Sequence, residues 1–247
     1  MRVLKFGGPS LADAAAIERL AVVVSSREGP RTVVVSALAG VTDALVHAAG
    51  SAAVDTAGAH DVVNGLTRRH HDLAGMVADQ RRRDLLRACI DGIATSAHGA
   101  VVSIAASRRA APPPLFDRLV ALGEVWSSRI VAAVLEDRGV SAKWLDARDV
   151  VRTDGGHQGA RPDTTATAAA VDRFVRPVLA FGRVAVLGGF IGSAPDGATT
   201  TLGRGGSDYS AALLAACLSA EIEFWTDVDG VLVADPRVVQ MARPLAS

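Results

Sequence analysis

VVVSALAGVTDAL, residues 33–45, joins a β-branched strand, a glycine turn and the start of a helix. The strand extends back to Thr32 and has no polar alternation, which is typical of a parallel strand buried on both faces. The opening of the chain repeats this order, with an apolar run at 3–6, a turn at 7–10 and helical spacing over 11–24. Strand and helix therefore alternate from the first residues, which predicts a doubly wound α/β sheet.

The alternation is interrupted once and then resumes. Residues from about 51 to 111 have long helical periods and no convincing strand, so we expect a helical excursion from the sheet. Three prolines, Pro112 to Pro114, are expected to end it, because proline cannot continue a helix interior. Further helices are predicted near 116–138, near 164–180 and from about 207. Strands are predicted near 142–146, 184–187 and 221–226, with a hairpin-like segment at 195–197.

Composition limits the classes of protein that this chain can belong to. It has 247 residues, 49% of them hydrophobic, which suffices for one large α/β domain or two small ones. With 26 basic and 26 acidic side chains the net charge is zero, so we expect neither nucleic acid nor membrane as a partner. The sequence has no uninterrupted apolar run long enough for a membrane span, and Lys5, Gly7 and Gly8 break any signal peptide. We expect a cytoplasmic protein.

Cysteine and histidine usage argues against a metal or disulfide framework. Cys89 and Cys217 lie far apart among apolar neighbours, so we expect two buried free thiols. The six histidines form no HExxH pattern, and the adjacent pair His70 and His71 would point in different directions on a helix. We predict no metal site built from side chains.

Lys5 stands at the end of the predicted first strand, directly before two glycines. It is one of only two lysines, the other being Lys143. It is either a strand-end lysine that reaches solvent or an ammonium beside a glycine loop whose N–H groups approach phosphates. The loop is not of the GxxxxGK[ST] or GxGxxG type.

The sequence GRGGSD, residues 203–208, places one arginine among three glycines at the start of a helix. Ser207 or Asp208 could simply cap that helix. Capping would not explain the glycines or Arg204, whose guanidinium can bind a carboxylate or phosphate with two parallel hydrogen bonds. The residues alone leave both interpretations open.

Five further segments agree with one known family in the same order. They are KFGG at 5–8, VVVSALAGVTDAL at 33–45, LGE at 122–124, GGFIG at 188–192 and WTDVDGV with DPR at 225–237. With GRGGSD, they make the chain resemble the catalytic domain of the aspartate kinases, within the amino acid kinase family. The resemblance covers nearly the whole chain and implies an αβα sandwich around a mainly parallel sheet.

The resemblance implies phosphoryl transfer from ATP, with Mg²⁺ held mainly through the phosphates, to the β-carboxylate of L-aspartate. The product would be 4-phospho-L-aspartate, an early intermediate in the biosynthesis of lysine, threonine and methionine. A carboxylate with a pKa of about 4 is already ionised at neutral pH, so it needs no general base. The site must instead position two anions and neutralise their charge.

The resemblance also implies roles in nucleotide binding. Lys5, Gly7 and Gly8 would hold the ATP phosphates, and Lys5 would neutralise the transferred group during catalysis. Four more residues match the stretch that lines the nucleotide in the family: Thr226, Asp227, Leu232 and Arg237.

For the substrate, the resemblance implies that Arg204 binds the α-carboxylate, with Ser207 close by. Glu124 and Asp208 would receive the ammonium group, and Asp208 would also orient Lys5 in catalysis. Two hydroxyl side chains are expected near the β-carboxylate: Ser36 and Thr42.

Two departures from the family pattern stand out. The family usually has threonine where Pro9 stands, and proline removes a backbone donor unless it occupies the first helical turn. The family also continues into a Gly-Ala-Lys stretch that supplies a second lysine, and then usually into ACT regulatory domains, whereas no lysine follows Lys143 here. We expect one catalytic domain over 1–247, incomplete at its C-terminus, without an ACT domain and with impaired turnover.

Two alternatives remain open. The chain could be another kinase of the same fold, acting on acetylglutamate, glutamate or a nucleoside monophosphate, although GRGGSD, GGFIG and LGE argue against that. It could also be a catalytically impaired remnant, or a fragment of a larger bifunctional or ACT-regulated enzyme, that binds nucleotide or amino acid. Assembly into a homo-oligomer is also left open.

Overall fold

The structure, a computed structural model, describes residues 1–226, 239, 241 and 243. The expected nucleotide-binding residues Asp227, Leu232 and Arg237 lie outside the described residues, so their roles stay predictions.

A five-stranded sheet forms the centre of the molecule, with every neighbouring pair parallel and the order β3-β4-β2-β1-β7. Its strands are β1 (Arg2–Phe6), β2 (Arg31–Val35), β3 (Ala142–Trp144), β4 (Val184–Gly188) and β7 (Glu221–Trp225). A separate antiparallel hairpin joins β5 (Ile191–Ser193) to β6 (Thr199–Thr201). The predicted strands and the hairpin are therefore confirmed within one or two residues.

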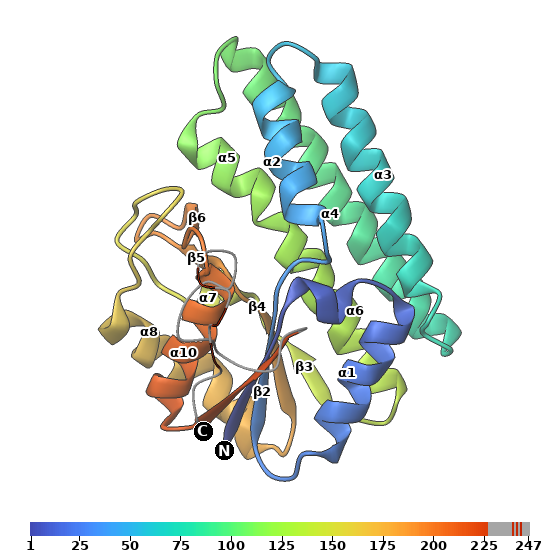
Figure 1. Cartoon of the computed structure of the whole chain (residues 1–247), viewed down its shortest axis with the longest axis vertical. Helices are drawn as coiled ribbons and strands as arrows, with labels where there is room; N and C mark the ends of the chain where they lie inside the picture. Colours follow the sequence, from blue (N-terminus) through green and yellow to red (C-terminus); the bar gives the residue numbers. More distant parts are fainter. Residues whose placement is uncertain (227–238, 240, 242, 244–247) are drawn as a thin grey trace.

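Helices cover both faces of the sheet, as Figure 1 shows. Leu4, Phe6 and Val33 face the core under α1 (Ala14–Ser26) and α6 (Leu122–Asp137). Val3 and Val34 alternate with them and face the opposite core. That second core is covered by α7 (Ala147–Val150), α9 (Arg176–Ala180) and α10 (Gly206–Leu218), with α8 (Thr164–Ala170) and a π-helical segment (Val171–Val175) leading into α9. The expected αβα sandwich is confirmed.

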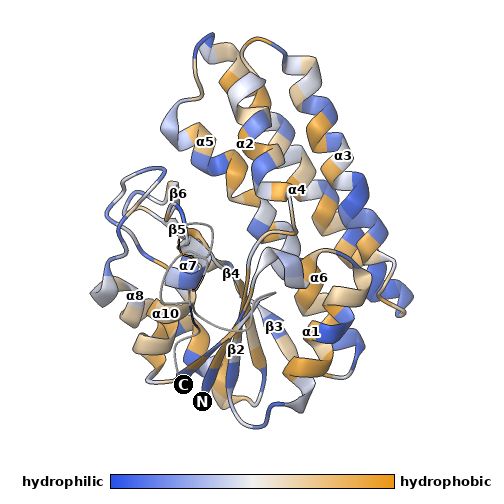
Figure 2. Cartoon of the chain, viewed as in Figure 1, coloured by the Kyte–Doolittle hydropathy of each residue, from blue (hydrophilic) through white to orange (hydrophobic). Residues whose placement is uncertain are grey.

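The expected helical excursion is also confirmed and forms a bundle at one end of the molecule (Figure 1). It comprises α2 (Val41–Ser51), α3 (Thr56–Ala74), α4 (Gln80–Ser107) and α5 (Pro113–Val120). Figure 2 shows hydrophilic residues along its outer surface. The prolines act differently from the expectation, because α4 already ends at Ser107 and Pro113 instead begins α5. Proline suits that first-turn position, where its missing N–H would have no partner in the helix.

Among the described helices, α4 is long and apolar enough, by length and composition only, to cross a membrane. One such helix is weak evidence, because core helices of soluble proteins pass the same test. The helix packs against α3, α5 and α6 with one face, which includes Ile90, Ala97 and Ile104.

The two cysteines are free, as expected, but each is only half-buried. Cys89 lies on α4 where that helix borders a cavity, and Cys217 lies near the end of α10. The prediction that the thiols are free is therefore confirmed, and the prediction that they are buried was wrong. The adjacent histidines do diverge: His70 stacks on Trp126, whereas His71 bonds Asp91 at 2.7 Å.

Candidate active site

Gly188 and Gly189, at the end of β4, let α6 and α10 pack closely against that strand. A Cβ atom on Gly188 would lie 2.9 Å from the Cβ of Glu124, and one on Gly189 would lie 2.8 Å from the Cα of Ser207. Any side chain would therefore push α6 or α10 away from the strand. The glycines of the GGFIG segment thus explain why Glu124 and Ser207, distant in sequence, reach the same cavity.

The GRGGSD segment forms the turn into α10. Gly203 and Gly205 have φ angles of 74° and 73°, in the left-handed region that favours glycine. Gly205 is the N-cap of α10, which has no side-chain cap. The interpretation of Ser207 or Asp208 as a simple helix cap is therefore wrong.

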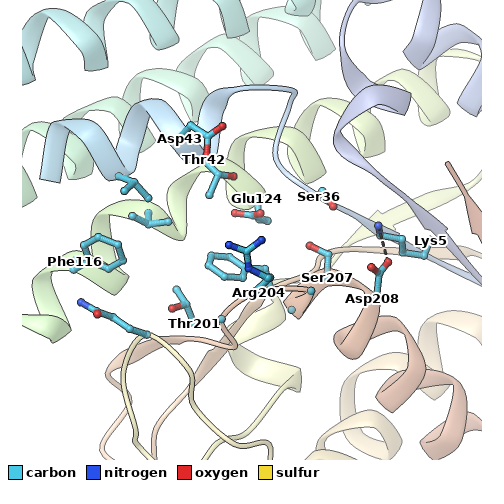
Figure 3. Close-up of a pocket in the computed structure, with 17 residues that line it drawn as sticks. Lys5, Ser36, Thr42, Asp43, Phe116, Glu124, Thr201, Arg204, Ser207 and Asp208 are labelled. Carbon is cyan, nitrogen blue, oxygen red and sulfur yellow. Dashed lines mark ion pairs between the residues drawn. The ribbon is translucent and has the colours of Figure 1, made fainter. Parts of the chain in front are cut away.

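A cavity of about 650 Å³ opens beside this turn, between the helical bundle and the sheet (Figure 3). The structure brings seven of the predicted residues together there: Lys5, Ser36, Thr42, Glu124, Arg204, Ser207 and Asp208. They come from β1, the end of β2, α2, α6 and the start of α10. The cavity lies at the carboxyl ends of the central strands, where ligands bind in open α/β sheets.

Lys5 and Asp208 form an ion pair at the wall of the cavity. The Lys5 Nζ lies 2.7 Å from the Asp208 Oδ1, and Lys5 is only 9% exposed (Figure 3). A buried ammonium group requires such a partner, because taking an unpaired charge out of water is strongly unfavourable. Of the two earlier interpretations of Lys5, the strand-end lysine that reaches solvent is excluded.

Glu124 is a buried carboxyl group, 3% exposed, with only one of its oxygens paired. Oε1 accepts a hydrogen bond from the Ala37 N–H at 3.1 Å, whereas Oε2 is buried without a partner among the described residues. Burial raises the pKa of Glu124 to about 8, although the bond from Ala37 opposes the shift. The cavity therefore contains an acid that a cationic group would satisfy.

Arg204 supplies a positive charge to the same cavity. Its guanidinium extends into the space below Glu124 and Thr42 in Figure 3. Arg204 is exposed and makes no hydrogen bond or ion pair with the described part of the chain. The cavity thus presents both a cation and an unsatisfied carboxyl.

Asp117 was not predicted, yet it organises one side of the cavity. This fully buried carboxylate accepts hydrogen bonds from the Thr201 hydroxyl at 2.7 Å and from His157 Nδ1 at 2.8 Å. The backbone N–H groups of Gln158 and Thr201 also donate to it. It therefore ties α5, β6 and the loop at Gln158 together, and both Thr201 and Gln158 line the cavity.

Sequence reasoning missed several further lining residues: Asp43, Val46, Phe116, Val120, Gln158, Phe190 and Thr201. Asp43 and Phe190 lie within quoted motifs and Thr201 stands shortly before GRGGSD, so their place in the sequence could have indicated them. Phe116 and Gln158 belong to α5 and a loop that carry no motif. Asp117 had a weak signal, as the only acidic residue of the short, mostly apolar helix α5.

Of the described residues expected at the nucleotide, Lys5 lines this cavity, whereas Gly7, Gly8 and Thr226 do not. The Gly7 N–H already donates to the Trp225 carbonyl at 3.2 Å, so Gly8 is the better candidate donor for a phosphate. Thr226 lines a neighbouring cavity of about 340 Å³ beside α1. Pro9 occupies the first turn of a short 3₁₀ helix (Gly8–Leu11), the position at which proline is tolerated.

Acidic, histidine and cysteine side chains do not gather into a metal site in the part of the chain that the structure describes. No group of three or more of them is placed to hold an ion there.

Comparison with known proteins gives consistent matches. The model of the amino acid kinase family matches residues 1–247. The lysine-sensitive aspartokinase 3 of Escherichia coli is 39% identical over 98% of this chain and 52% of its own length. The aspartokinase of Chlamydia pneumoniae is 32% identical, over 98% of this chain and 50% of its own. The chain thus spans about half the length of these relatives.

A solved structure of Escherichia coli aspartokinase III in complex with aspartate and ADP has a TM-score of 0.89 to this chain. The two chains are 37% identical, and the match spans 99% of this chain and 53% of the Escherichia coli chain. The same enzyme with lysine and aspartate has a TM-score of 0.85. Clostridium acetobutylicum aspartate kinase, 23% identical with a TM-score of 0.71, shares the fold.

Proposed function

The chain belongs to the amino acid kinase family, and on this premise we propose that it is the catalytic domain of an aspartate kinase. The observation that carries the proposal is that one cavity holds both the Arg204 guanidinium and the Glu124 carboxyl, one oxygen of which has no partner among the described residues. An α-amino acid presents a carboxylate and an ammonium group on one carbon. Arg204 would bind the carboxylate, and Glu124 would receive the ammonium, assisted by Asp208.

The substrate's side chain would extend toward Lys5. Ser36 and Thr42 line the cavity with hydroxyl groups, which can orient the β-carboxylate of L-aspartate. A β-carboxylate oxygen attacks the γ-phosphorus of ATP, the bond between that phosphorus and the β,γ-bridging oxygen breaks, and ADP leaves. No proton is transferred, so the products are 4-phospho-L-aspartate and ADP.

Charge neutralisation would be the main task of the protein in this step. The Lys5 ammonium would meet the second anion, and its ion pair with Asp208 would fix its position before ATP binds. The Gly8 N–H and the residues around Thr226 would hold the nucleotide. Mg²⁺ would be held mainly through the ATP phosphates, where it neutralises negative charge, and the exposed Asp208 carboxylate is an oxygen donor that suits this ion.

The Escherichia coli aspartokinase III structure with aspartate and ADP supports both ligands. The similarity to these aspartokinases also supports a cytoplasmic enzyme of amino-acid biosynthesis. Because the relatives are about twice as long as this chain, their length supports a further region that regulates this domain.

A coupled assay for ADP release, combined with ATP titration by calorimetry, tests the proposal. We expect ADP release with L-aspartate and Mg²⁺, and little with D-aspartate, L-glutamate or acetylglutamate. Preference for another acceptor would identify a different kinase of the same fold. ATP binding without turnover on any acceptor would indicate a non-catalytic domain.

A further inference from the structure

A second cavity, of about 540 Å³, lies on the side of α6 away from Glu124. It is bordered by α4, α5 and α6, by β3 and the turn after it, and by the turn between β5 and β6. None of its lining residues lines the candidate active site. The proposed reaction therefore leaves this cavity without a role.

Its charged lining is mostly basic, because three arginines and one acid meet there: Arg118, Arg129, Arg148 and Asp146. Arg148 binds Asp146 through two nitrogens, Nε to Oδ1 at 2.9 Å and Nη2 to Oδ2 at 2.5 Å. That pair is electrically neutral. Arg118 and Arg129 form no ion pair with any described residue, so the cavity keeps about two uncompensated positive charges.

Arg129 is held in place without a polar partner. Its guanidinium carbon lies 3.2 Å from the centre of the Trp144 ring, and its Nε is buried with no hydrogen-bond partner among the described residues. Burial lowers the pKa of this guanidinium. A desolvated guanidinium with a free N–H is a strong binding group for a carboxylate or phosphate.

The rest of the lining sets the size and polarity of a ligand. Ile93, Leu122 and Val125 contribute apolar surface, and Trp144 contributes an aromatic ring. The volume falls within the range of metabolite sites, which are commonly apolar with a few placed polar groups. A small anion with an organic body fits this combination better than a bare inorganic ion.

We propose that this cavity is a second ligand site, in which Arg118 and Arg129 bind a small organic dianion, a phosphate monoester or a dicarboxylate. The site is distinct from that of the proposed kinase reaction, because no residue lines both cavities.

Cys89 provides a local reporter, since its half-buried thiol lines this cavity whereas Cys217 lies on α10. We would follow alkylation of both thiols by N-ethylmaleimide with mass spectrometry, using phenyl phosphate and phthalate at millimolar concentrations as probes. We expect at least one probe to slow alkylation of Cys89 fivefold or more while Cys217 reacts at an unchanged rate.

Variants separate this site from other anion sites. Arg118→Gln should abolish most of the protection and should fold normally, because Arg118 is exposed and makes no hydrogen bond or ion pair with the described residues. Arg129→Gln should also abolish most of the protection of Cys89. Arg81→Gln removes an equivalent charge from the exposed surface of α4 and should leave protection intact, as should Arg204→Lys in the candidate active site.

Three results would overturn the proposal. They are an unchanged Cys89 rate with both probes, equal protection of Cys217, and protection that survives in both Arg118→Gln and Arg129→Gln. An acidic side chain of another segment or of a second copy filling the cavity would produce the first result.

Discussion

The Glu124 carboxyl has a pKa of about 8 in the folded chain against an ordinary 4.5, so folding suppresses its charge at neutral pH. Such a group stabilises the folded state fully below pH 4.5, and this contribution is lost as the pH rises from 4.5 to 8. At neutral pH the ligand-free folded protein has therefore lost much of this stabilisation. The missing partner of Oε2 is the structural reason.

Replacing Glu124 by glutamine should stabilise the empty protein. Glutamine keeps the acceptor for the Ala37 N–H but cannot ionise, so we expect the free energy of unfolding to rise by about 2–4 kcal/mol at pH 8. The gain should vanish near pH 4.5. Urea unfolding across this pH range measures it, with the exposed Glu28→Gln as a control that changes stability by less than about 0.5 kcal/mol. A gain that did not vary with pH would contradict the assignment.

Binding of L-aspartate should release a proton. If the substrate ammonium pairs with ionised Glu124, the carboxyl must lose the proton that it holds below pH 8. We expect about one proton released per aspartate at pH 7, and an affinity that rises up to tenfold per pH unit toward pH 8. Calorimetry in buffers with different ionisation enthalpies counts the protons. Proton release that persists in Glu124→Gln would show that another group is responsible.

Arg204→Lys should separate the two ligands. A lysine cannot form two parallel hydrogen bonds to a carboxylate, so aspartate binding should weaken by about 2–5 kcal/mol. ATP binding should remain nearly intact, because its expected contacts lie around Lys5 and Thr226. Titration of each ligand alone measures both, and equal losses would assign Arg204 to the nucleotide or to the fold.

At the scale of elements, the end of β4 determines how closely α10 approaches the sheet. Gly189→Ala would place a Cβ atom 2.8 Å from the backbone of Ser207, which cannot rotate away. We expect a loss of about 1–3 kcal/mol in stability, as for overpacked cores, together with a higher KM for aspartate. Gly99→Ala is the matched control, because nothing lies within 4 Å of its added Cβ on α4. Gly99→Ala should raise the free energy of unfolding by about 0.5–1 kcal/mol. Equal changes in stability for the two variants would show that the close contact with Ser207 does not matter.

Most elements could be predicted because their patterns are local. The β-branched run at 32–35 predicts β2 directly, and the glycine turn at 203–206 predicts the start of α10. The helix expected over 116–138 is instead two, α5 and α6, divided at Ala121. Ala121 has helical dihedral angles and gives no sequence signal, so only packing explains the division.

The candidate site was predictable where motifs carry it. Lys5, Glu124 and Arg204 lie within quoted motifs. Asp117 was missed because its partners, among them His157 and Thr201, come from segments distant in sequence. Such long-range pairings cannot be read from one sequence without a fold. The Lys5–Asp208 pair was expected from the resemblance, and the structure now gives it a distance.

At the scale of the whole molecule, β7 closes the sheet beside β1. A chain that stops after Ala220 would leave the edge of β1 unpaired, and open apolar edges promote aggregation. We expect it to elute as aggregates in size-exclusion chromatography and to unfold at a lower temperature than a chain that stops after Thr226. Equal behaviour of the two chains would show that β7 adds little to the sheet.

The same pairing has a consequence for the time at which the sheet can form. Arg2 pairs with Glu221, so β1 must wait during synthesis for β7, which lies far downstream. At about 5–20 residues per second, the intervening stretch of about 220 residues takes on the order of 10–45 seconds to synthesise. Throughout that interval the nascent chain carries the edge of β1 without its β7 partner. Its yield in cells should therefore depend on translation speed and on chaperones that shield such edges.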